Sequence, residues 1–443
     1  MEKKKFTARE AAYRSLYLCE RDKKYSSLEI DASIKRFSLE GADRGLYTAL
    51  VYGVIERKIT LDYIISRLSS KPLESLDSEV LTLLRIGLYQ LIWLDRIPAS
   101  AAVNETVNLA KKNAPRASSF INAVLRNFLR TMDKNNLPYP DKNDTEKYLS
   151  VRYSCGHDAL GVLSESLSDV CSVLGAFEHQ PDVTLRVNTL KISREELLSK
   201  LAQNGIEAEA TEYSPFGVKL IGKTLPKEVS ELISGGFVYI QDEASQIAVL
   251  AAAVKPDSVL IDTCSCPGGK SFTAAILMEN KGRVFSFDLH KNKLSLVESG
   301  AKKLGITIIE TSEKDGSKPD ESLKETADTV ICDVPCSGLG VIAKKPEIRY
   351  KSKAEFSRLP EIQYSILSNA AEYVKSGGVL CYSTCTLNKA ENEAVVKRFL
   401  AENDNFMAED FKVGTLESSA GMLTLYPNVH GTDGFFVAKL RKK

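Results

Sequence analysis

The strongest constraint on the fold is an alternation of short β-rich runs with helical patterns that begins near Phe237. The β-rich runs lie at residues 258–262, 283–287, 307–309, 329–332 and 379–383. Helical patterns lie near residues 270–280, 291–304, 358–375 and 389–401. Strands that alternate with helices favour a parallel sheet covered by helices on both faces. We therefore predict a doubly wound, Rossmann-like α/β domain over residues 236–443.

The residues before this domain predict two further domains. Residues 1–135 show apolar side chains at helical spacing, and the stretch from Val80 to Ile92 is so apolar that it predicts a central buried helix. A linker rich in Pro, Asp and Asn ends this all-α domain. Residues 145–235 then read as helices followed by a strand, a helix opened by Ser193 and another strand, which predicts a small α/β insert, ferredoxin- or RRM-like. A chain of 443 residues is too long for a single core, so three domains are reasonable.

The charges are unevenly distributed although the formal net charge is only +1. Residues 1–140 contain 23 Lys and Arg against 16 Asp and Glu, whereas the remaining residues contain 36 against 42. A basic first domain is typical of a module that binds nucleic acid phosphates. A solvated, lysine-rich helical surface explains the same excess equally well.

Composition narrows the cellular setting. The longest apolar stretch, residues 247–254, is too short to cross a bilayer, and the first residues lack an apolar signal core. The nine cysteines are odd in number and several fall inside motifs, which indicates reduced thiols. We expect a cytoplasmic protein without a membrane partner, and a monomer.

A glycine-containing loop follows the first predicted strand, Asp262-Thr-Cys-Ser-Cys-Pro-Gly-Gly-Lys270. Glycines let backbone N–H groups approach a ligand, and the helix that follows favours a negative group at its N-terminus. The tail Gly269-Lys270-Ser271 mimics a phosphate-binding P-loop, with Asp333 as its acidic partner, but that motif needs glycine where Cys264 stands. A nucleoside triphosphate is therefore the less favoured ligand.

Asp288 favours S-adenosylmethionine instead. It ends the second predicted strand, 19 residues after Gly269, and the dinucleotide-binding Gly-x-Gly-x-x-Gly pattern is absent. A carboxylate at this place accepts hydrogen bonds from both hydroxyls of a ribose.

Two cysteines follow predicted strands, in Asp333-Val-Pro-Cys336-Ser-Gly and in Ser383-Thr-Cys385-Thr. The edge of the sheet where they lie is where α/β enzymes place their chemistry. Such thiols suit methylation of cytosine at carbon 5, because thiolate addition to carbon 6 makes carbon 5 nucleophilic. A proton must then leave carbon 5 before the thiol is eliminated. The spacing alone does not tell which cysteine attacks.

Other chemistries have less support. A single cysteine is most often a small buried apolar residue. A zinc site built from Cys264, Cys266, Cys332, Cys336, Cys381 and Cys385 lacks the usual Cys-x-x-Cys spacing, so we expect no metal. The four histidines form no Ser/His/Asp or Cys/His arrangement, so hydrolase chemistry has no support.

Three segments of the first domain resemble the NusB family. They are Leu84-Arg-Ile-Gly-Leu-Tyr-Gln-Leu, Ile97-Pro-Ala-Ser-Ala-Ala-Val-Asn-Glu-Thr-Val and Phe120-Ile-Asn-Ala-Val-Leu-Arg-Asn. Members of that family are RNA-binding helical bundles. The resemblance covers most of residues 5–131 and favours RNA as the reason for the basic excess.

The loop and the two cysteine motifs, in this order, resemble the RNA cytosine-5 methyltransferase family. Gln241-Asp-Glu-Ala-Ser245, Lys345-Pro-Glu-Ile-Arg349 and Asp433-Gly-Phe-Phe-Val-Ala support the resemblance. Together with the NusB-like domain it spans nearly the whole chain, and the pairing implies small-subunit (16S) ribosomal RNA, unassembled or partly assembled, as the substrate.

The resemblance implies roles for single residues. Cys385 would be the nucleophile, Cys336 would assist release of the methylated base, and Asp333 would bond the polar edge of the cytosine near the methyl donor. The residues implied to bind S-adenosylmethionine are Cys264, Ser265, Cys266, Pro267, Gly268, Gly269 and Lys270 at its methionine portion, Asp288 at its ribose and Asp315 at its adenine.

Some residues depart from the family pattern. Ser265 and Cys266 stand where members usually have two alanines, and the segment around Asp315 is weakly patterned, so that Asp315 also reads as a turn residue before Gly316. Two alternative functions stay open. One is methylation of transfer RNA or another RNA, and the other is a non-enzymatic RNA-binding or antitermination factor with a vestigial methyltransferase fold.

Overall fold

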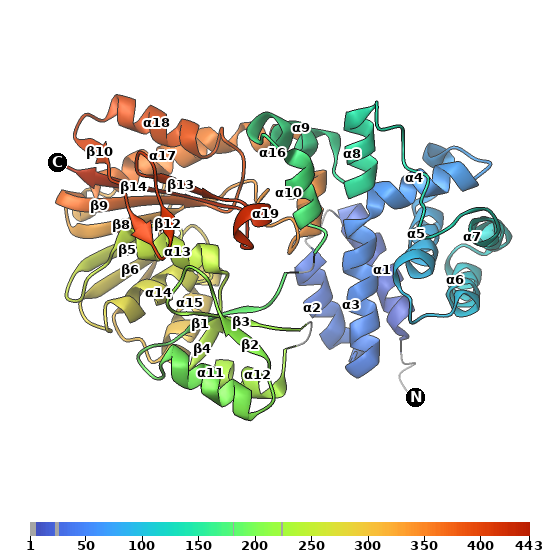
Figure 1. The fold of residues 1–443 in the computed structure, drawn as a ribbon, viewed down its shortest axis with the longest axis horizontal. Coiled ribbons are helices and arrows are strands. Elements are labelled where there is room, and N and C mark those ends of the chain that lie inside the picture. Colours follow the sequence, from blue (N-terminus) through green and yellow to red (C-terminus); the bar gives the residue numbers. More distant parts are fainter. Residues whose placement is uncertain (1–5, 23–25, 180, 223–224) are drawn as a thin grey trace. The chain divides into compact units, whose positions relative to one another are not determined.

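The computed structural model describes residues 6–22, 26–179, 181–222 and 225–443, so residues 1–5, with which the first predicted domain begins, lie outside the described part. The chain divides into two compact units (Figure 1). One consists of Met1–Gly161 with Ile342–Ser352 and is helical. The other consists of Val162–Val341 with Lys353–Lys443 and is α/β.

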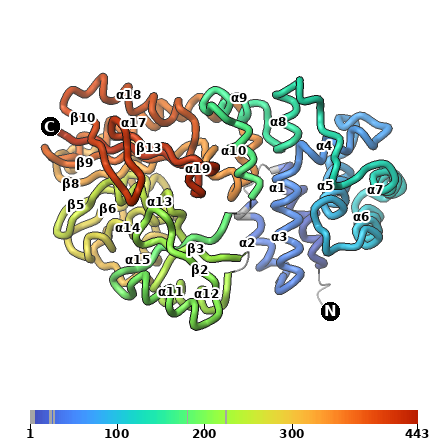
Figure 2. The backbone as a smooth tube through the Cα atoms, viewed as in Figure 1, coloured from blue at the N-terminus to red at the C-terminus, as the bar shows by residue number. Residues whose placement is uncertain are grey.

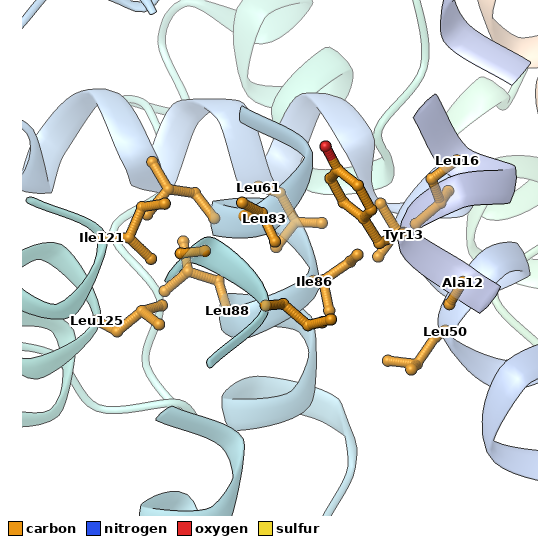
Figure 3. Close-up of a cluster of buried hydrophobic side chains, with 14 of the residues drawn as sticks. Ala12, Tyr13, Leu16, Leu50, Leu61, Leu83, Ile86, Leu88, Ile121 and Leu125 are labelled. Atoms are coloured by element: carbon orange, nitrogen blue, oxygen red, sulfur yellow. The ribbon is translucent and has the colours of Figure 1, made fainter. Parts of the chain in front are cut away.

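The helical unit is built around α5 (Ser78–Trp93). Leu83, Ile86 and Leu88 of this helix are fully buried among side chains from the surrounding helices (Figure 3). The predicted central buried helix is therefore confirmed. The other helices are α1 (Ala8–Asp22), α2 (Ser26–Phe37), α3 (Gly41–Glu56), α4 (Lys58–Leu68), α6 (Ala99–Asn113), α7 (Ser118–Thr131) and α8 (Thr145–Tyr153), with short 3-10 turns η1 (Leu73–Ser75), η2 (Pro115–Ala117) and η4 (Pro346–Tyr350).

Ile342–Ser352, which the sequence analysis places within residues 236–443, packs in the helical unit. Arg349 donates from Nη1 to the carbonyl of Tyr153 at 2.8 Å. Tyr350 donates from its hydroxyl to the carbonyl of Ile55 at 2.5 Å. These bonds give buried polar groups partners that the segment itself does not supply.

The α/β unit begins with helices and a small antiparallel sheet in the order β2-β3-β1-β4. Ser193 opens α11 as predicted, because its Oγ accepts the N–H of Glu196 and the Glu196 carboxylate accepts the N–H of Ser193. Helices α11 and α12 lie side by side (Figures 1 and 2). Helix α9 (His157–Ser166) spans the division of the chain between Gly161 and Val162. The other elements are α10 (Val170–Ala176), β1 (Thr184–Val187), α11 (Arg194–Gln203), β2 (Ala208–Ala210), β3 (Gly217–Leu220), α12 (Lys227–Ser234) and β4 (Val238–Ile240).

The large sheet has the order β10-β14-β9-β8-β5-β6-β7, with β13 paired to β14. The five predicted strands, β5 to β9, are parallel as expected, whereas β14, which was not predicted, is antiparallel to β9, so the whole sheet is mixed. Residues 426–434, which join β13 to β14, are too few for the crossover that parallel strands need, so these two strands pair antiparallel. The strands are β5 (Val259–Asp262), β6 (Arg283–Asp288), β7 (Ile309–Glu313), β8 (Ala327–Asp333), β9 (Val374–Thr384), β10 (Phe406–Ala408), β13 (Met422–Leu425) and β14 (Phe435–Lys442), with β11 (Lys412–Val413) and β12 (Leu416–Glu417) forming a separate ribbon.

Helices cover both faces of the large sheet (Figure 1). Successive strand residues point to opposite faces, so Leu260 packs with α13, α14 and α15, whereas Ile261 packs with α17 and α18. The layers confirm the predicted Rossmann-like architecture. The helices are α13 (Glu243–Ala252), α14 (Gly269–Leu277), α15 (Lys291–Leu304), α16 (Lys353–Ser357), α17 (Leu359–Glu372), α18 (Glu393–Glu402) and α19 (Pro427–His430), with the turn η3 (Glu321–Leu323).

Strand β7 begins at Ile309, two residues later than the sequence suggested. Gly305 ends α15 in the left-handed region, and the N–H of Ile306 still bonds back to Ala301. The N–H of Thr307 bonds to the side chain of Asn280. Residues 305–307 therefore belong to the cap of helix α15, although the apolar pattern there favours a strand.

Within the described residues, no single helix is long and apolar enough to cross a membrane. The bent pair α9 and α10 passes the same test by length and composition only.

Candidate active site

The residues singled out from the sequence gather where β5, β6, β8 and β9 end. Strand order runs from β5 through β6 to β7 on one side, and β8 and β9 lie on the other side of β5. The sheet therefore reverses its winding between β5 and β8. Such a switch point at the carboxyl ends of parallel strands is where open α/β sheets bind ligands.

The loop of residues 263–268 leads from β5 into α14. Ser265 donates its N–H to the carbonyl of Phe287 at 2.8 Å, and Gly268 donates its N–H to the carbonyl of Ser265 at 2.7 Å. Gly268 has φ of +113°, and a Cβ there would lie 2.3 Å from the ring of Phe272. Only glycine fits this turn. Pro267 is exposed on it, and Gly269 opens the helix.

Asp288 lies against this loop at the end of β6. Its Oδ2 accepts the N–H of Cys266 at 3.3 Å, and its Oδ1 accepts the N–H of His290 at 2.9 Å. Burial, and then the neighbouring Asp288, raise the pKa of the Cys266 thiol to about 12. Burial likewise raises the pKa of Cys264. Both thiols of the loop therefore stay protonated at neutral pH.

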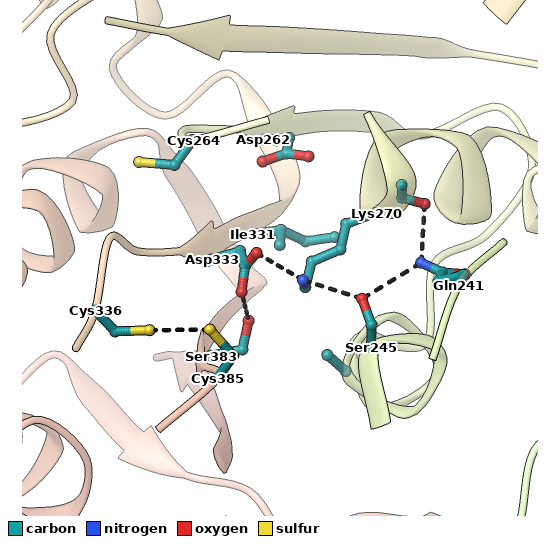
Figure 4. A network of polar contacts seen from close by, with 12 residues as sticks. Gln241, Ser245, Asp262, Cys264, Lys270, Ile331, Asp333, Cys336, Ser383 and Cys385 are labelled. Atoms are coloured by element: carbon teal, nitrogen blue, oxygen red, sulfur yellow. Dashed lines mark hydrogen bonds and ion pairs between the residues drawn. The ribbon is translucent and has the colours of Figure 1, made fainter. Parts of the chain in front are cut away.

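Lys270, which is buried, and Asp333, which is half-buried, form an ion pair (Figure 4). The Lys270 Nζ lies 2.6 Å from Asp333 Oδ2 and 3.2 Å from the hydroxyl of Ser245. Asp333 Oδ1 accepts a hydrogen bond from Ser383 at 2.9 Å. Burial is the largest single effect and lowers the pKa of Lys270, but the charge and the hydrogen bond of Asp333, together with the charge of Asp262, outweigh it and raise the pKa. Asp333 is thus held as a hydrogen-bond acceptor with a fixed orientation.

The two cysteines of the strand ends form a thiol pair. The Sγ atoms of Cys336 and Cys385 lie 3.2 Å apart (Figure 4), although 49 residues separate them in the sequence. The N–H of Gly340 bonds to the carbonyl of Cys385 at 3.0 Å and ties the two segments together. The hydrogen bond to Cys385, together with burial, raises the pKa of Cys336 well above its ordinary value.

Asp262 is fully buried at the end of β5. Its Oδ2 accepts the hydroxyl of Ser271 at 2.7 Å, whereas Oδ1 has no hydrogen-bond partner among the described residues. Burial raises the pKa of Asp262 to about 6. In the sequence Asp262 is only the first residue of the loop motif, whereas in the structure its unpartnered oxygen is a strong acceptor for a donor group of a ligand.

Asp315 lies in a pocket of about 310 Å³ that Thr263 and Phe287 also line. Its carboxylate accepts the N–H and the hydroxyl of Ser317, and the hydroxyl is the main reason that the pKa of Asp315 is lowered. The bonds to Ser317 are those of the predicted turn residue. Asp315 also shares this pocket with Thr263, the first residue of the loop, as expected of a residue beside the cofactor.

Several polar residues of this site escaped the sequence analysis as functional candidates. Ser245 and Ser383 contact the ion pair, and Gln241 donates from Nε2 to the carbonyl of Gly269 at 3.1 Å. Glu391 is fully buried and accepts the N–H of Ser337, beside Cys336. A run of polar residues after an apolar strand was the only sequence signal for Glu391. Within the described residues, no group of three or more His, Cys, Asp or Glu side chains is arranged to hold a metal.

The Rossmann-like sheet, its loop at the switch point and its strand-end thiols define a methyltransferase-type enzyme. Residues 249–441 match the family model for 16S rRNA methyltransferase RsmB/F, residues 7–130 match the NusB family, and residues 168–225 match the ferredoxin-like domain of RsmF/B-like methyltransferases. The chain belongs to the 16S rRNA methyltransferase RsmB/F family, in the form that carries a NusB domain. The predicted family and fold class are confirmed, whereas the exact domain boundaries stay predictions.

Relatives match over the whole chain. The chain is 38% identical to the Probable ribosomal RNA small subunit methyltransferase B of Bacillus subtilis (strain 168), over 99% of this chain and 100% of that one. It is 35% identical to the protein of the same name from Synechocystis sp., over 98% and 99%. The crystal structure of PH0851 is similar with a TM-score of 0.80 and 26% identity, covering 98% of each chain.

Proposed function

We propose that this rRNA methyltransferase transfers the methyl group of S-adenosylmethionine to carbon 5 of a cytosine in 16S ribosomal RNA, with Cys385 as a covalent nucleophile. The observation that carries the proposal is the thiol pair Cys336–Cys385, which lies at the same sheet edge as the Asp333–Lys270 ion pair. The family match and the name of the Bacillus subtilis relative support rRNA as the substrate.

The loop and its neighbours fit S-adenosylmethionine. Asp262 presents a buried oxygen without a partner in the described residues, which suits a donor such as the ammonium of the methionine portion. Asp288, half-buried at the end of β6, would accept the ribose hydroxyls, and Asp315 would lie on the adenine side. The residues from Cys264 to Lys270 would line the methionine portion. When bound, S-adenosylmethionine supplies an electrophilic methyl group on a sulfonium.

The thiols and the ion pair divide the remaining work. Cys385 would add through its thiolate to carbon 6 of the cytosine, which makes carbon 5 able to take the methyl group. Asp333, held as an acceptor by Lys270 and Ser383, would bond the exocyclic amino group of the base. After methylation the proton of carbon 5 would pass to water, and its electron pair would re-form the double bond between carbons 5 and 6. The bond between Cys385 and carbon 6 then breaks and regenerates the Cys385 thiolate, a release that Cys336 would assist.

The requirements on the RNA follow from the place of Cys385, which is half-buried after the end of β9. A cytosine must leave its stack to reach Cys385, so an unpaired loop or rRNA that is not fully assembled is the expected substrate. The basic excess of residues 1–140 would hold backbone phosphates and make binding salt-dependent.

RNA carrying 5-fluorocytosine tests the proposal. Fluorine does not leave carbon 5 as a proton does, so the purified protein with S-adenosylmethionine should form an adduct that survives denaturing electrophoresis. Peptide mapping should place the adduct on Cys385, and Cys385→Ala should form none. Cys336→Ala should trap an adduct with unmodified RNA. Full methyl transfer by Cys385→Ala would refute the covalent mechanism.

A further inference from the structure

A turn that follows β9 carries a buried carboxylate that the catalytic proposal does not use. Glu391 is fully buried although it is charged. Its side chain and that of the adjacent Asn392 face the segments that carry Cys336 and Cys385. Charged residues are rarely fully buried unless several hydrogen bonds compensate their lost hydration, so the partners of Glu391 are informative.

The carboxylate of Glu391 accepts hydrogen bonds that hold the segment around Cys336 in place. Its Oε2 accepts the backbone N–H of Ser337 at 2.8 Å and the side-chain amide of Gln363 at 2.9 Å. The same amide of Gln363 donates to the carbonyl of Pro335 at 3.0 Å. Cys336 is therefore fixed through the residues immediately before and after it.

The side chain of the neighbouring Asn392 holds the segment around Cys385 by hydrogen bonds in the same way. Its Oδ1 accepts the hydroxyl of Thr384 at 2.5 Å, and its Nδ2 donates to the carbonyl of Thr386 at 2.9 Å. The hydroxyl of Thr386 lies 2.7 Å from that of Ser337, which joins the two segments directly. Thr384, Thr386, Ser337 and Asn392 are all buried, so water does not compete for these bonds.

We propose that Glu391 is a positioning residue whose buried carboxylate, together with Asn392, holds the Cys336 and Cys385 segments in register so that their sulfur atoms stay in contact. The consequence for turnover rests on the proposed function, whereas the consequence for the thiols does not. Turnover would fall because a thiol displaced by a fraction of an ångström no longer matches the reacting base.

A carboxylate suits this role better than an amide. Oε2 accepts two N–H groups, and Oε1 accepts the side-chain amide of Asn388 at 2.9 Å. All three partners donate, so Glu391→Gln would place an NH₂ group against a donor. Asn388 cannot simply reverse its amide, because its Oδ1 accepts the N–H of Ala390 at 3.1 Å.

The rate at which a disulfide forms between Cys336 and Cys385 measures how well the two segments are aligned, and the measurement needs no RNA. Diamide oxidises the two thiols, a sulfur–sulfur bond forms, and the azo group of diamide takes up both hydrogens. We expect the wild-type protein to form the linked peptide rapidly and Glu391→Gln to form it about tenfold more slowly. Mass spectrometry of that linked peptide separates it from disulfides of other cysteines. In methyl transfer, kcat should fall by a similar factor while KM for S-adenosylmethionine and for RNA stays unchanged.

Glu243→Gln is the matched control. Glu243 is also a buried carboxylate of the α/β unit, and it accepts the N–H groups of Tyr213 and Ser214 at 2.7 Å each. This variant removes the charge of a buried carboxylate in the same unit and should keep the wild-type closure rate. The double variant Glu391→Gln with Asn388→Asp restores an acceptor opposite the new NH₂ group and should recover most of the closure rate.

Each outcome decides a separate point. Closure at the wild-type rate in Glu391→Gln, or equal slowing in Glu243→Gln, would overturn the positioning role. Absence of recovery in the double variant would also overturn it. If closure slows as expected while Cys385→Ala still methylates RNA, the positioning role stands and the covalent mechanism fails.

Discussion

Removing the charge of Lys270 and removing the charge of Asp333 should cost different free energies of unfolding. Lys270→Met and Asp333→Asn both remove one charge with little change in side-chain volume. The two partners differ in burial, because the side chain of Lys270 is 10% exposed and that of Asp333 is 30% exposed. A charge left behind is costly only where water cannot reach it.

The expected free energies of unfolding follow from this difference. Asp333→Asn leaves a buried ammonium without its main partner, and we expect a cost of about 2 to 3 kcal/mol. This cost is smaller than that of breaking a fully buried ion pair, because Asp262 still attracts Lys270. Lys270→Met leaves Asp333, which water can solvate, and Asp262, which can take up a proton. We expect a cost of about 1 kcal/mol, as for a partly exposed pair.

The pH dependence has a defined sign. The pKa of Lys270 is raised in the folded protein, so the pair contributes its full stability below the ordinary lysine pKa of about 10.5. That contribution is lost as the pH rises through the raised pKa. The contribution of the intact pair should therefore be constant near neutral pH and should fall only in strongly alkaline solution.

Thiol labelling in the native state measures these costs within the α/β unit. Cys332 and Cys381 are fully buried in its sheet, so iodoacetamide labels them only when the unit opens. A difference of about 1.4 kcal/mol changes the labelling rate about tenfold. Cys155, which is fully buried in the helical unit, is the control and should label at the wild-type rate. Equal acceleration in both variants, or a larger effect of Lys270→Met, would refute the reasoning.

Three further predictions concern the cofactor loop. Gly268→Ala should destabilise the protein by about 2 to 3 kcal/mol and abolish S-adenosylmethionine binding in calorimetry, because the new Cβ would clash with Phe272. The double variant Gly268→Ala with Phe272→Leu should recover part of the stability. Asp288→Asn should weaken S-adenosylmethionine binding about tenfold or more with little change in the urea midpoint. Asp262→Asn should destabilise the protein less at pH 8 than at pH 5, because a carboxyl whose pKa is raised to about 6 costs stability once it ionises; equal urea midpoint shifts at both pH values would contradict this.

The sequence allowed the site to be placed because its residues follow strands. Parallel strands end at one sheet edge, so motifs that begin at Asp262, Asp288, Asp333 and Ser383 had to converge there. The antiparallel strand β14 was missed, because the analysis took Asp433-Gly-Phe-Phe-Val-Ala only as a family segment and assigned it no strand. Its position beside β9 depends on pairings between distant residues that no local pattern encodes.

The partners of the motif residues were harder to predict. Lys270 reads from the sequence as a P-loop-like residue that contacts a ligand, yet its Nζ bonds to Asp333, 63 residues away in the sequence. The loop geometry places the start of α14 beside the end of β8, and only tertiary structure reveals that the lysine turns toward a carboxylate. Glu391 was missed for the same reason, because its donors come from three separate segments.

The thiol pair also bears on a question that the motif spacing left open, namely which cysteine attacks. Cys336 holds its proton, since the hydrogen bond to Cys385 and burial both raise the pKa of Cys336. A protonated Cys336 at 3.2 Å can donate that hydrogen toward the other sulfur and stabilise negative charge there. Either sulfur can be the donor in this contact, so the geometry of the pair fits each cysteine as the thiolate, and the role of Cys385 as nucleophile stays a proposal.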